Sequence, residues 1–399
     1  LSRSRRRRLH NRAAEVIETL YADDHSTVVY DLARHFYKGQ NHSRAVQYLL
    51  RAGSSTTEIY AFQEAMKYYE QALDSFAHLE PTLENQRLRM EVLNRMASLS
   101  QLLGDWDEAL RTNQRLIELT VEMDDILRRA EAHRRIADIH RQRGNWDEAV
   151  ANFNSALELS RSVGELYGIF DAQKGLGHVH WRLGEFDQAV EHFNEVLASA
   201  DQIQDDFIVA TVNIDLGNVF NSRDDLEEAE GYYRRPKKTL EAMDEPYELA
   251  RAYNNLGDVY MKTRRWGDAL KCFSSCQENA RLSGNVLMAA WSRFNAGECY
   301  MHMGELVSAR KLCEEAMPDL LRLDNKVGLS AVHRNLGTLK YIEGDIDGGD
   351  REFQKALDII EELNSPGELA ELHSRGDRKL RHTVTLAGLV PGEVYSFTV

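Results

Sequence analysis

Residues 144–150 read Gly-Asn-Trp-Asp-Glu-Ala-Val, and versions of the same seven residues recur along the chain. The stretch Gly-Asp-Trp-Asp-Glu-Ala-Leu occupies 104–110, and Gly-Glu-Phe-Asp-Gln-Ala-Val occupies 184–190. Further, increasingly altered copies occupy 224–230, 264–270, 304–310 and 344–350. The step between copies is therefore constant, and a constant period over seven copies indicates an array in which each period is one supersecondary unit.

A second landmark keeps the same step and lies twelve positions before the small residue of each copy. It is itself small, and its members are Ala97, Ala137, Gly177, Gly217, Gly257, Gly297 and Gly337. Small residues let two helices approach closely, and large side chains three or four positions away fill the space beside them. The Gly-Asp or Gly-Asn between the two landmarks is typical of a tight turn. Each unit is therefore predicted to be a pair of helices.

The order Leu-Gly, aromatic, Ala, aromatic, as in Leu176-Gly177, His180, Ala189 and Phe193, resembles the tetratricopeptide repeat. The usual repeat is shorter, at about 34 residues, so the longer period here would extend the helices and the turn between units. Units of this greater length resemble those of Pins/LGN-type adaptors and of STAND-type regulatory ATPases. The resemblance implies an all-α fold, a right-handed α-α superhelix or solenoid, with seven units over residues 84–364.

The two ends of the chain do not keep this period. Residues 1–83 are expected to form a helical lead-in with irregular hairpins, since Ala45 and Ala65 look like the same position only half a period apart. Residues 365–399 begin as an aborted eighth unit and then alternate around Pro391-Gly392, which predicts a short β-hairpin tail. That tail resembles a fragment of a fibronectin type III domain, with Tyr395 at the place of its tyrosine corner.

Composition argues against several partners. The 49 Lys and Arg against 64 Asp and Glu give a formal charge of −15, which does not suit nucleic acid or an anionic membrane. There is no run of 18 apolar residues that would span a bilayer. Four cysteines in 399 residues are not a disulfide framework, so we expect a cytoplasmic protein. Cys276 and Cys313 fall at core positions of the repeat, which favours buried thiols over a zinc cluster involving Cys272 and Cys299.

The sequence contains no phosphate loop and none of the common hydrolase motifs. We therefore expect no enzyme activity, no metal and no cofactor. His140 and His180 occupy seam positions and are expected to be core or half-buried. Pro236 and Pro318 fall within the second helices of two units, where proline predicts a kink or an early helix end. The alternative is a bend in the superhelix that shapes its groove.

The first helix of each unit is expected to line the concave face of the superhelix. A residue two positions before the seam Leu lies about 200° around the helix, on the opposite face. This stripe is rich in Asn, which can both donate to and accept from an extended peptide backbone. Trp291 and Phe294 are further candidate anchors. With the resemblance to Pins/LGN-type adaptors, the predicted partner-binding residues are Arg134, Lys174, His178, Trp181, Asn218, Asn254, Asn255, Asp258, Asn295, Arg334 and Asn335.

The leading hypothesis is a non-catalytic interaction scaffold that binds a peptide or protein segment in this groove. One alternative is the sensor arm of a STAND-type signalling ATPase whose nucleotide-binding core is not in this chain. Another is a self-assembling structural array, which a monomer at all concentrations would exclude. The sequence leaves the oligomeric state open.

Overall fold

The computed structural model describes residues 2–22 and 24–362, and every regular element in them is helical. The predicted all-α fold is confirmed for this part of the chain. The predicted aborted eighth unit and β-hairpin tail, residues 365–399, lie outside the described residues. Within the described part, no helix combines the length and apolar character needed to cross a lipid bilayer.

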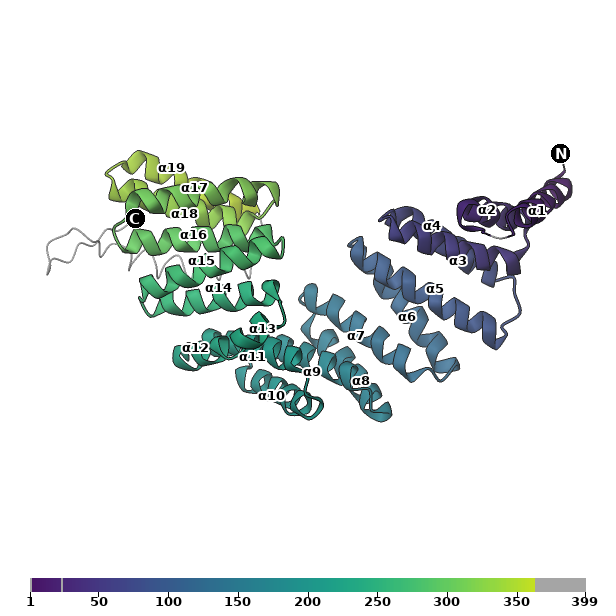
Figure 1. Ribbon diagram of the computed structural model, residues 1–399, viewed down its shortest axis with the longest axis horizontal. Helices are drawn as coiled ribbons and strands as arrows, with labels where there is room; N and C mark the ends of the chain where they lie inside the picture. The colour runs from purple at the N-terminus through teal and green to yellow at the C-terminus, as the bar shows by residue number, and fades with distance from the viewer. Residues whose placement is uncertain (1, 23, 363–399) are drawn as a thin grey trace. The chain divides into compact units, whose positions relative to one another are not determined.

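Each 40-residue unit is a helical hairpin, and the seven hairpins, here called the first to seventh repeats, follow one another without an insertion (Figure 1). The first helices are α5 (Leu83–Leu102), α7 (Ile126–Gln142), α9 (Leu166–Leu183), α11 (Asp206–Ser222), α14 (Pro246–Lys262), α16 (Val286–His302) and α18 (Lys326–Ile342). The second helices are α6 (Trp106–Glu122), α8 (Trp146–Val163), α10 (Phe186–Ile203), the pair α12 (Leu226–Arg234) and α13 (Lys237–Ala242), α15 (Trp266–Leu282), α17 (Leu306–Arg322) and α19 (Ile346–Glu362).

The residues before the first repeat form helices of irregular length. These are α1 (Arg3–Leu20), the short 3₁₀ turn η1 (Ser26–Val28), α2 (Val29–Gly39), α3 (His42–Glu58) and α4 (Phe62–Phe76). Phe36, Leu49 and Tyr69 are buried together in one core cluster that joins α2, α3 and α4. The same cluster contains Val92, Met96 and Leu99 of α5, so these helices pack directly onto the first repeat.

The chain divides into two compact bodies, residues 1–192 and 193–399. The N-terminal body contains the first helices of three repeats and a core cluster built on Phe153, Leu157 and Leu176. The C-terminal body has a core cluster built on Tyr233 and Phe273, and a further cluster towards α18. Each body thus has its own apolar interior, as expected of stacked repeats.

The seam predicted inside each repeat is confirmed most directly in the C-terminal body. A Cβ placed on Gly217 would lie 2.5 Å from the Tyr233 ring, and one on Gly257 would lie 2.6 Å from the Phe273 ring. No side chain fits at such a distance, so glycine is required where the aromatic ring presses on the opposite helix. Tyr233 and Phe273 are almost completely buried as a result.

The tight turn between the helices of a repeat combines a left-handed residue with a capping side chain. In the first repeat, Gly104 has φ +73°, a conformation that costs glycine little. Asp105 follows as the N-cap of α6, and its carboxylate accepts a hydrogen bond from the Glu108 N–H at 3.1 Å. This satisfies one of the four free N–H groups at the start of the helix.

The two prolines in second helices behave differently. Pro236 interrupts the second helix of the fourth repeat, because α12 ends at Arg234 and α13 begins at Lys237. Pro318 stays inside α17, which runs on to Arg322. The predicted early helix end is therefore confirmed at Pro236, whereas the helix continues through Pro318.

Candidate functional site

The predicted partner-binding residues follow the first helices of six repeats, and we call this set of eleven residues the polar stripe. Ten of them are half-buried in the structure, and Asn335 is buried with 3% of its surface exposed. Half-buried polar residues are held in place by their neighbours yet keep part of their surface for a ligand.

In the N-terminal body, the stripe consists of charged pairs. Arg134 forms ion pairs with Asp138 at 3.6 Å on its own helix and with Asp171 of α9 at 3.5 Å. The neighbouring Arg135 donates to the Asn94 side-chain oxygen of α5 at 2.7 Å. His178 and Trp181 lie edge to face on α9, with ring centroids 6.3 Å apart. The charge of Arg134 is thus paired with two carboxylates.

In the C-terminal body, the stripe is a ladder of side-chain amides between α11 and α14. The Asn218 side-chain oxygen accepts from Asn255 at 2.7 Å and from the Tyr233 hydroxyl at 2.8 Å. One turn further on, Asn221 donates to Asp258 at 3.1 Å. Hydrogen bonds between successive first helices therefore use much of the polarity of this face.

Ion pairs support this ladder from the buried side. Arg251 of α14 reaches Asp215 of α11 at 3.0 Å and Glu248 of its own helix at 2.6 Å. Burial works against the charge of Arg251, but the two carboxylates outweigh it and raise the pKa of the guanidinium. Burial also raises the pKa of Tyr233, which keeps its hydroxyl protonated as the donor to Asn218.

Asn254 makes a weaker side-chain hydrogen bond within the fold than its neighbour Asn255 does. The Asn254 amide donates to the Asn255 side-chain oxygen at a long 3.3 Å. Its own side-chain oxygen is buried and has no hydrogen-bond partner among the described residues. A buried acceptor without a donor costs free energy, which an incoming N–H group would recover. Arg334 lies 3.9 Å from the Glu298 carboxylate, beyond hydrogen-bond range.

Two residues of the predicted exposed face are in fact core residues. Phe294, a candidate anchor, is 3% exposed and belongs to the cluster that contains Leu329 and Leu336 of α18. Asn335 is equally buried. Phe294 is covered because α16 packs against α18, the first helix of the next repeat, as well as against its own partner. The face opposite the seam is therefore narrower than a single helix suggests.

The four cysteines are buried, as predicted. Burial raises the pKa of Cys272 to about 11 and those of Cys276, Cys299 and Cys313 to about 12. The thiols are therefore protonated at neutral pH, whereas a metal ligand or nucleophile needs the thiolate. Among the described residues, no group of three or more His, Cys, Asp or Glu side chains could hold a metal ion.

The histidines at the seam are half-buried, as predicted, and each contacts the turn that follows it. His180 Nδ1 lies 2.6 Å from the Glu185 carboxylate, and His140 Nδ1 lies 3.3 Å from the Asn145 amide. These contacts tie the end of the first helix to the cap of the second. A structural role explains both residues.

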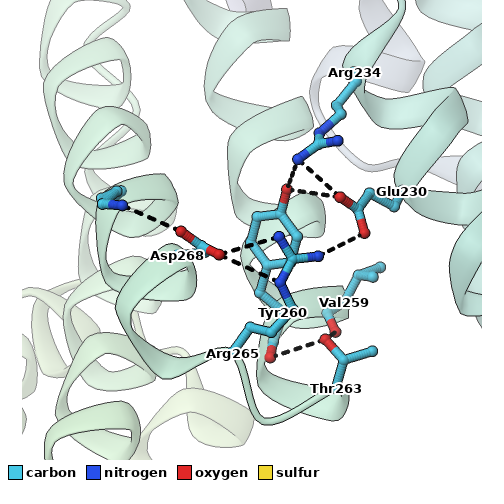
Figure 2. Close-up of polar contacts among 8 residues, drawn as sticks. Glu230, Arg234, Val259, Tyr260, Thr263, Arg265 and Asp268 are labelled. Atoms are coloured by element: carbon cyan, nitrogen blue, oxygen red, sulfur yellow. Dashed lines mark hydrogen bonds and ion pairs between the residues drawn. The ribbon is translucent and has the colours of Figure 1, made fainter.

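A cavity of about 310 Å³ lies in the C-terminal body, and its lining includes no residue of the polar stripe. Side chains from α12, α13, α14 and α15 line it, and Figure 2 shows three of its charged residues, Arg234, Arg265 and Asp268. The sequence reasoning did not find it. The available signal was Lys237, which stands where the first and second repeats have Ile117 and Leu157.

Solved structures with a similar fold come from several sources, all at low sequence identity. The apo quorum sensor NprR from B. thuringiensis has a TM-score of 0.63 at 14% identity, over 89% of this chain and 97% of that one. The Rap conjugation gene regulator of plasmid pLS20, in complex with the Phr* peptide, has a TM-score of 0.52 at 14% identity, over 80% and 96%. At these identities the likeness shows the fold alone.

A third structure is a STAND protein (Signal Transduction ATPase with Numerous Domains) with a tetratricopeptide repeat sensor, from Pyrococcus horikoshii. The TM-score is 0.59 at 16% identity, and the match covers 90% of this chain but 54% of that protein. This chain therefore spans about half of the STAND protein's length. Comparison with curated protein sequences gave no significant match.

The family model for the tetratricopeptide repeat matches the sequence in four overlapping or successive places. The matched residues are 88–162, 128–202, 168–235 and 248–322, which together make up more than half of the chain. They coincide with the helical hairpins of the first to sixth repeats. The chain belongs to the tetratricopeptide repeat family.

Proposed function

We propose that this protein is a non-catalytic scaffold that binds an extended peptide or protein segment along the polar stripe. In this proposal the repeats form a right-handed superhelix and the stripe lies in its concave groove. We also propose that residues 1–83 act as a lead-in and that residues 84–364 are the binding array. The observation that carries the proposal is the amide ladder on α11 and α14, with the unpartnered acceptor of Asn254 beside it.

The chemistry of this ladder suits a peptide backbone. Asn218 and Asn255 are held by hydrogen bonds to each other, so little side-chain entropy remains to be lost when a ligand binds. The Asn254 oxygen can accept a backbone N–H, and the Asn295 amide on the next first helix offers both a donor and an acceptor. Repeated amides along successive helices match the regular spacing of groups on an extended chain.

A direct test separates binding from folding. Peptide binders are selected from a displayed random library on the wild-type chain, and their affinity is measured by fluorescence anisotropy. The double variant Asn254→Ala/Asn295→Ala should weaken binding about tenfold or more, because each buried hydrogen bond contributes on the order of 1 kcal/mol. Both residues are only half-buried, so the thermal midpoint should change little.

Two further variants serve as controls. Asn194→Ala removes an exposed Asn from the second helix α10 and should leave peptide affinity unchanged. Asn255→Ala breaks the bond to Asn218 and should lower the thermal midpoint as well as the affinity. Unchanged affinity in the double variant would show that the stripe is not the binding surface.

A second candidate function is the sensor arm of a STAND-type signalling ATPase. The observation that favours it is the fold likeness to the Pyrococcus horikoshii protein, which extends over 90% of this chain. The full-length coding sequence gives the test, because the hypothesis requires an upstream Gly-x-x-x-x-Gly-Lys-Ser/Thr phosphate loop. A full-length protein without that motif would exclude this role and leave the scaffold proposal untouched.

A further inference from the structure

The cavity of about 310 Å³ in the C-terminal body lies where the second helix of the fourth repeat is interrupted. Its floor is formed by Leu249, Ala252 and Leu256 of α14, each less than 8% exposed. Its walls come from Tyr233 of α12 and Tyr253 and Tyr260 of α14. The volume is at the lower end of the range for small-molecule pockets, and an apolar floor is typical of them.

The repeat period shows what normally fills this space. Two periods earlier, the register counterparts of the floor residues Leu249, Ala252 and Leu256 are Ile169, Ala172 and Leu176. Ala172 and Leu176 share one core cluster with Leu157, the counterpart of Lys237, and Ile169 packs against that cluster. There, a leucine from the second helix of the second repeat packs in one core with the counterparts of the floor residues, which lie on the first helix of the third repeat. In the fourth repeat a lysine stands in its place, and the floor lines a cavity.

A second departure from the period places another cation at the rim. The N-cap residues of the other second helices are Asp105, Asn145, Glu185, Asp225, Glu305 and Asp345, and the fifth repeat has Arg265. Acidic and amide side chains stabilise the start of a helix, so a positively charged arginine is unfavourable at this position. Arg265 makes no capping hydrogen bond, and its guanidinium lies over the Tyr260 ring at 4.2 Å.

Four cations line the cavity, and we call them the rim cations: Arg234, Lys237, Arg265 and Lys271. They differ in how closely carboxylates pair with them. Figure 2 shows Arg234 and Arg265 converging on Glu230 and Tyr260, with ion pairs to Glu230 of 2.8 and 2.9 Å. Asp268 pairs with Arg265 at 3.1 Å and with Lys271 at 3.2 Å.

Lys237 has the weakest carboxylate contact of the four cations, 3.8 Å to Glu241. Its ammonium lies 5.2 Å from the centre of the Tyr253 ring, at the mouth of the cavity. The other three cations share Glu230 and Asp268 at 2.8–3.2 Å, whereas the carboxylate of Glu241 lies beyond hydrogen-bond range of Lys237. Lys237 is therefore the cation of this group that is most available to a ligand.

We propose that this cavity binds a small amphiphilic carboxylate, with its single negative charge at Lys237 and its aliphatic or aromatic body on the floor of Leu249, Ala252 and Leu256. The apolar floor requires an apolar body, and the tyrosine walls suit either a flat or a flexible one. One loosely paired lysine matches a monoanion, whereas a multiply charged phosphate would have to displace Glu230 or Asp268 from its arginine. The cavity lining contains no residue of the polar stripe, although the wall residue Tyr233 donates its hydroxyl to Asn218.

The test uses the full chain and two matched probes in isothermal titration calorimetry. Octanoate should bind saturably with one site per chain, and the neutral analogue 1-octanol should bind at least tenfold more weakly. Lys237→Leu restores the residue type of the second repeat and should weaken octanoate binding at least tenfold. Lys237→Gln removes the charge but keeps an unbranched polar side chain and should have the same effect, which protects the test against a folding defect in the first variant.

Two control variants complete the design. Lys238→Leu makes the same replacement one position away, outside the cavity lining, and should bind octanoate as the wild type does. Asn254→Ala lies in the polar stripe and should also leave octanoate binding unchanged, which keeps this test separate from that of peptide binding. Octanol binding as tight as octanoate, no saturable octanoate binding, or wild-type affinity in Lys237→Gln would each overturn the proposal.

Discussion

The second helices of the second and fourth repeats begin alike and then diverge. Phe153 in α8 and Tyr233 in α12 occupy the same position, and each is 1% exposed. Three and four positions later, α8 has Ala156 and Leu157, both buried, and continues to its end at Val163. The fourth repeat has Pro236 and Lys237 instead, and its helix is interrupted.

This difference shows which contact a repeat can lose. The aromatic ring packs with the small residue of its partner helix, Ala137 for Phe153 and Gly217 for Tyr233, and it also contacts the first helix of the next repeat. The residue four positions later belongs to the core shared with the next repeat, as the cluster of Leu157 with α9 shows. A repeat can therefore lose the second contact and remain folded. The fourth repeat has done so and has a cavity at that position.

The largest loss of stability is expected on removing the aromatic ring that the two second helices have in common. Phe153→Ala and Tyr233→Ala should each lower the free energy of unfolding by about 3–5 kcal/mol, since both remove a fully buried ring. Urea denaturation followed by circular dichroism measures both losses. A cost for Tyr233→Ala well below that for Phe153→Ala would mean that the helix interruption has also loosened the seam of the fourth repeat.

A smaller effect is expected on making the second repeat resemble the fourth. Leu157→Lys should lower the free energy of unfolding by about 2 kcal/mol, because a buried leucine is lost while the lysine stem still covers part of the surface. The same denaturation experiment measures it. Glu158→Lys, on the exposed side of α8, is the matched control and should cost little. Equal costs for the two variants would contradict the role assigned to Leu157.

The reciprocal change should stabilise the protein modestly. Lys237→Leu covers Leu249 and Leu256, and cavity filling of this kind commonly raises the free energy of unfolding by about 1 kcal/mol. The loss of the lysine contact with the Tyr253 ring subtracts part of that gain. A shift of the urea midpoint to higher concentration would agree with this account. A destabilised Lys237→Leu would show that the lysine, rather than the missing leucine, holds α13 in place.

The smallest expected change in stability appears only at acidic pH. It concerns a contact that the second and seventh repeats make at equivalent positions. His133 contacts Asn152 at 2.9 Å in the second repeat, and five periods later His333 contacts Glu352 at 2.7 Å. Burial opposes ionisation of Glu352, but hydrogen bonds from His333, Lys355 and Lys340 outweigh it and lower the pKa of the carboxyl to about 2. The matched position in the second repeat carries no charge.

The sign of the pH dependence follows from that lowered pKa. A carboxyl with a lower pKa in the folded state stabilises the fold above its unfolded pKa of 4.5, and this contribution is lost as the pH falls towards 2. Glu352→Asn, which copies the second repeat, should therefore flatten the fall in urea midpoint between about pH 5 and pH 2. Parallel pH profiles for wild type and variant would contradict the assignment.

Much of the fold could be predicted from the sequence because its landmarks repeat at fixed separations within one hairpin. The Gly217 and Tyr233 seam, the turn at Gly104 and the burial of Cys276 and Cys313 all follow from the 40-residue period. The face opposite the seam was deduced from a single helix, and ten of the eleven stripe residues on it are half-buried. That deduction was wrong for Phe294, which the next repeat covers, and for Asn335, which is buried beside Cys313 of α17.

The periodic sequence is enough to specify an array of helical hairpins, because the hairpin contacts lie close together along the chain and repeat. How successive hairpins divide their polar and apolar groups depends on the way they stack. The tertiary structure joins Asn218 to Asn255 across 37 residues and brings α12, α13, α14 and α15 around one cavity. Such contacts depend on the stacking of helices. Lys237 can line a cavity only because stacking places Leu249, Ala252 and Leu256 of α14 next to it.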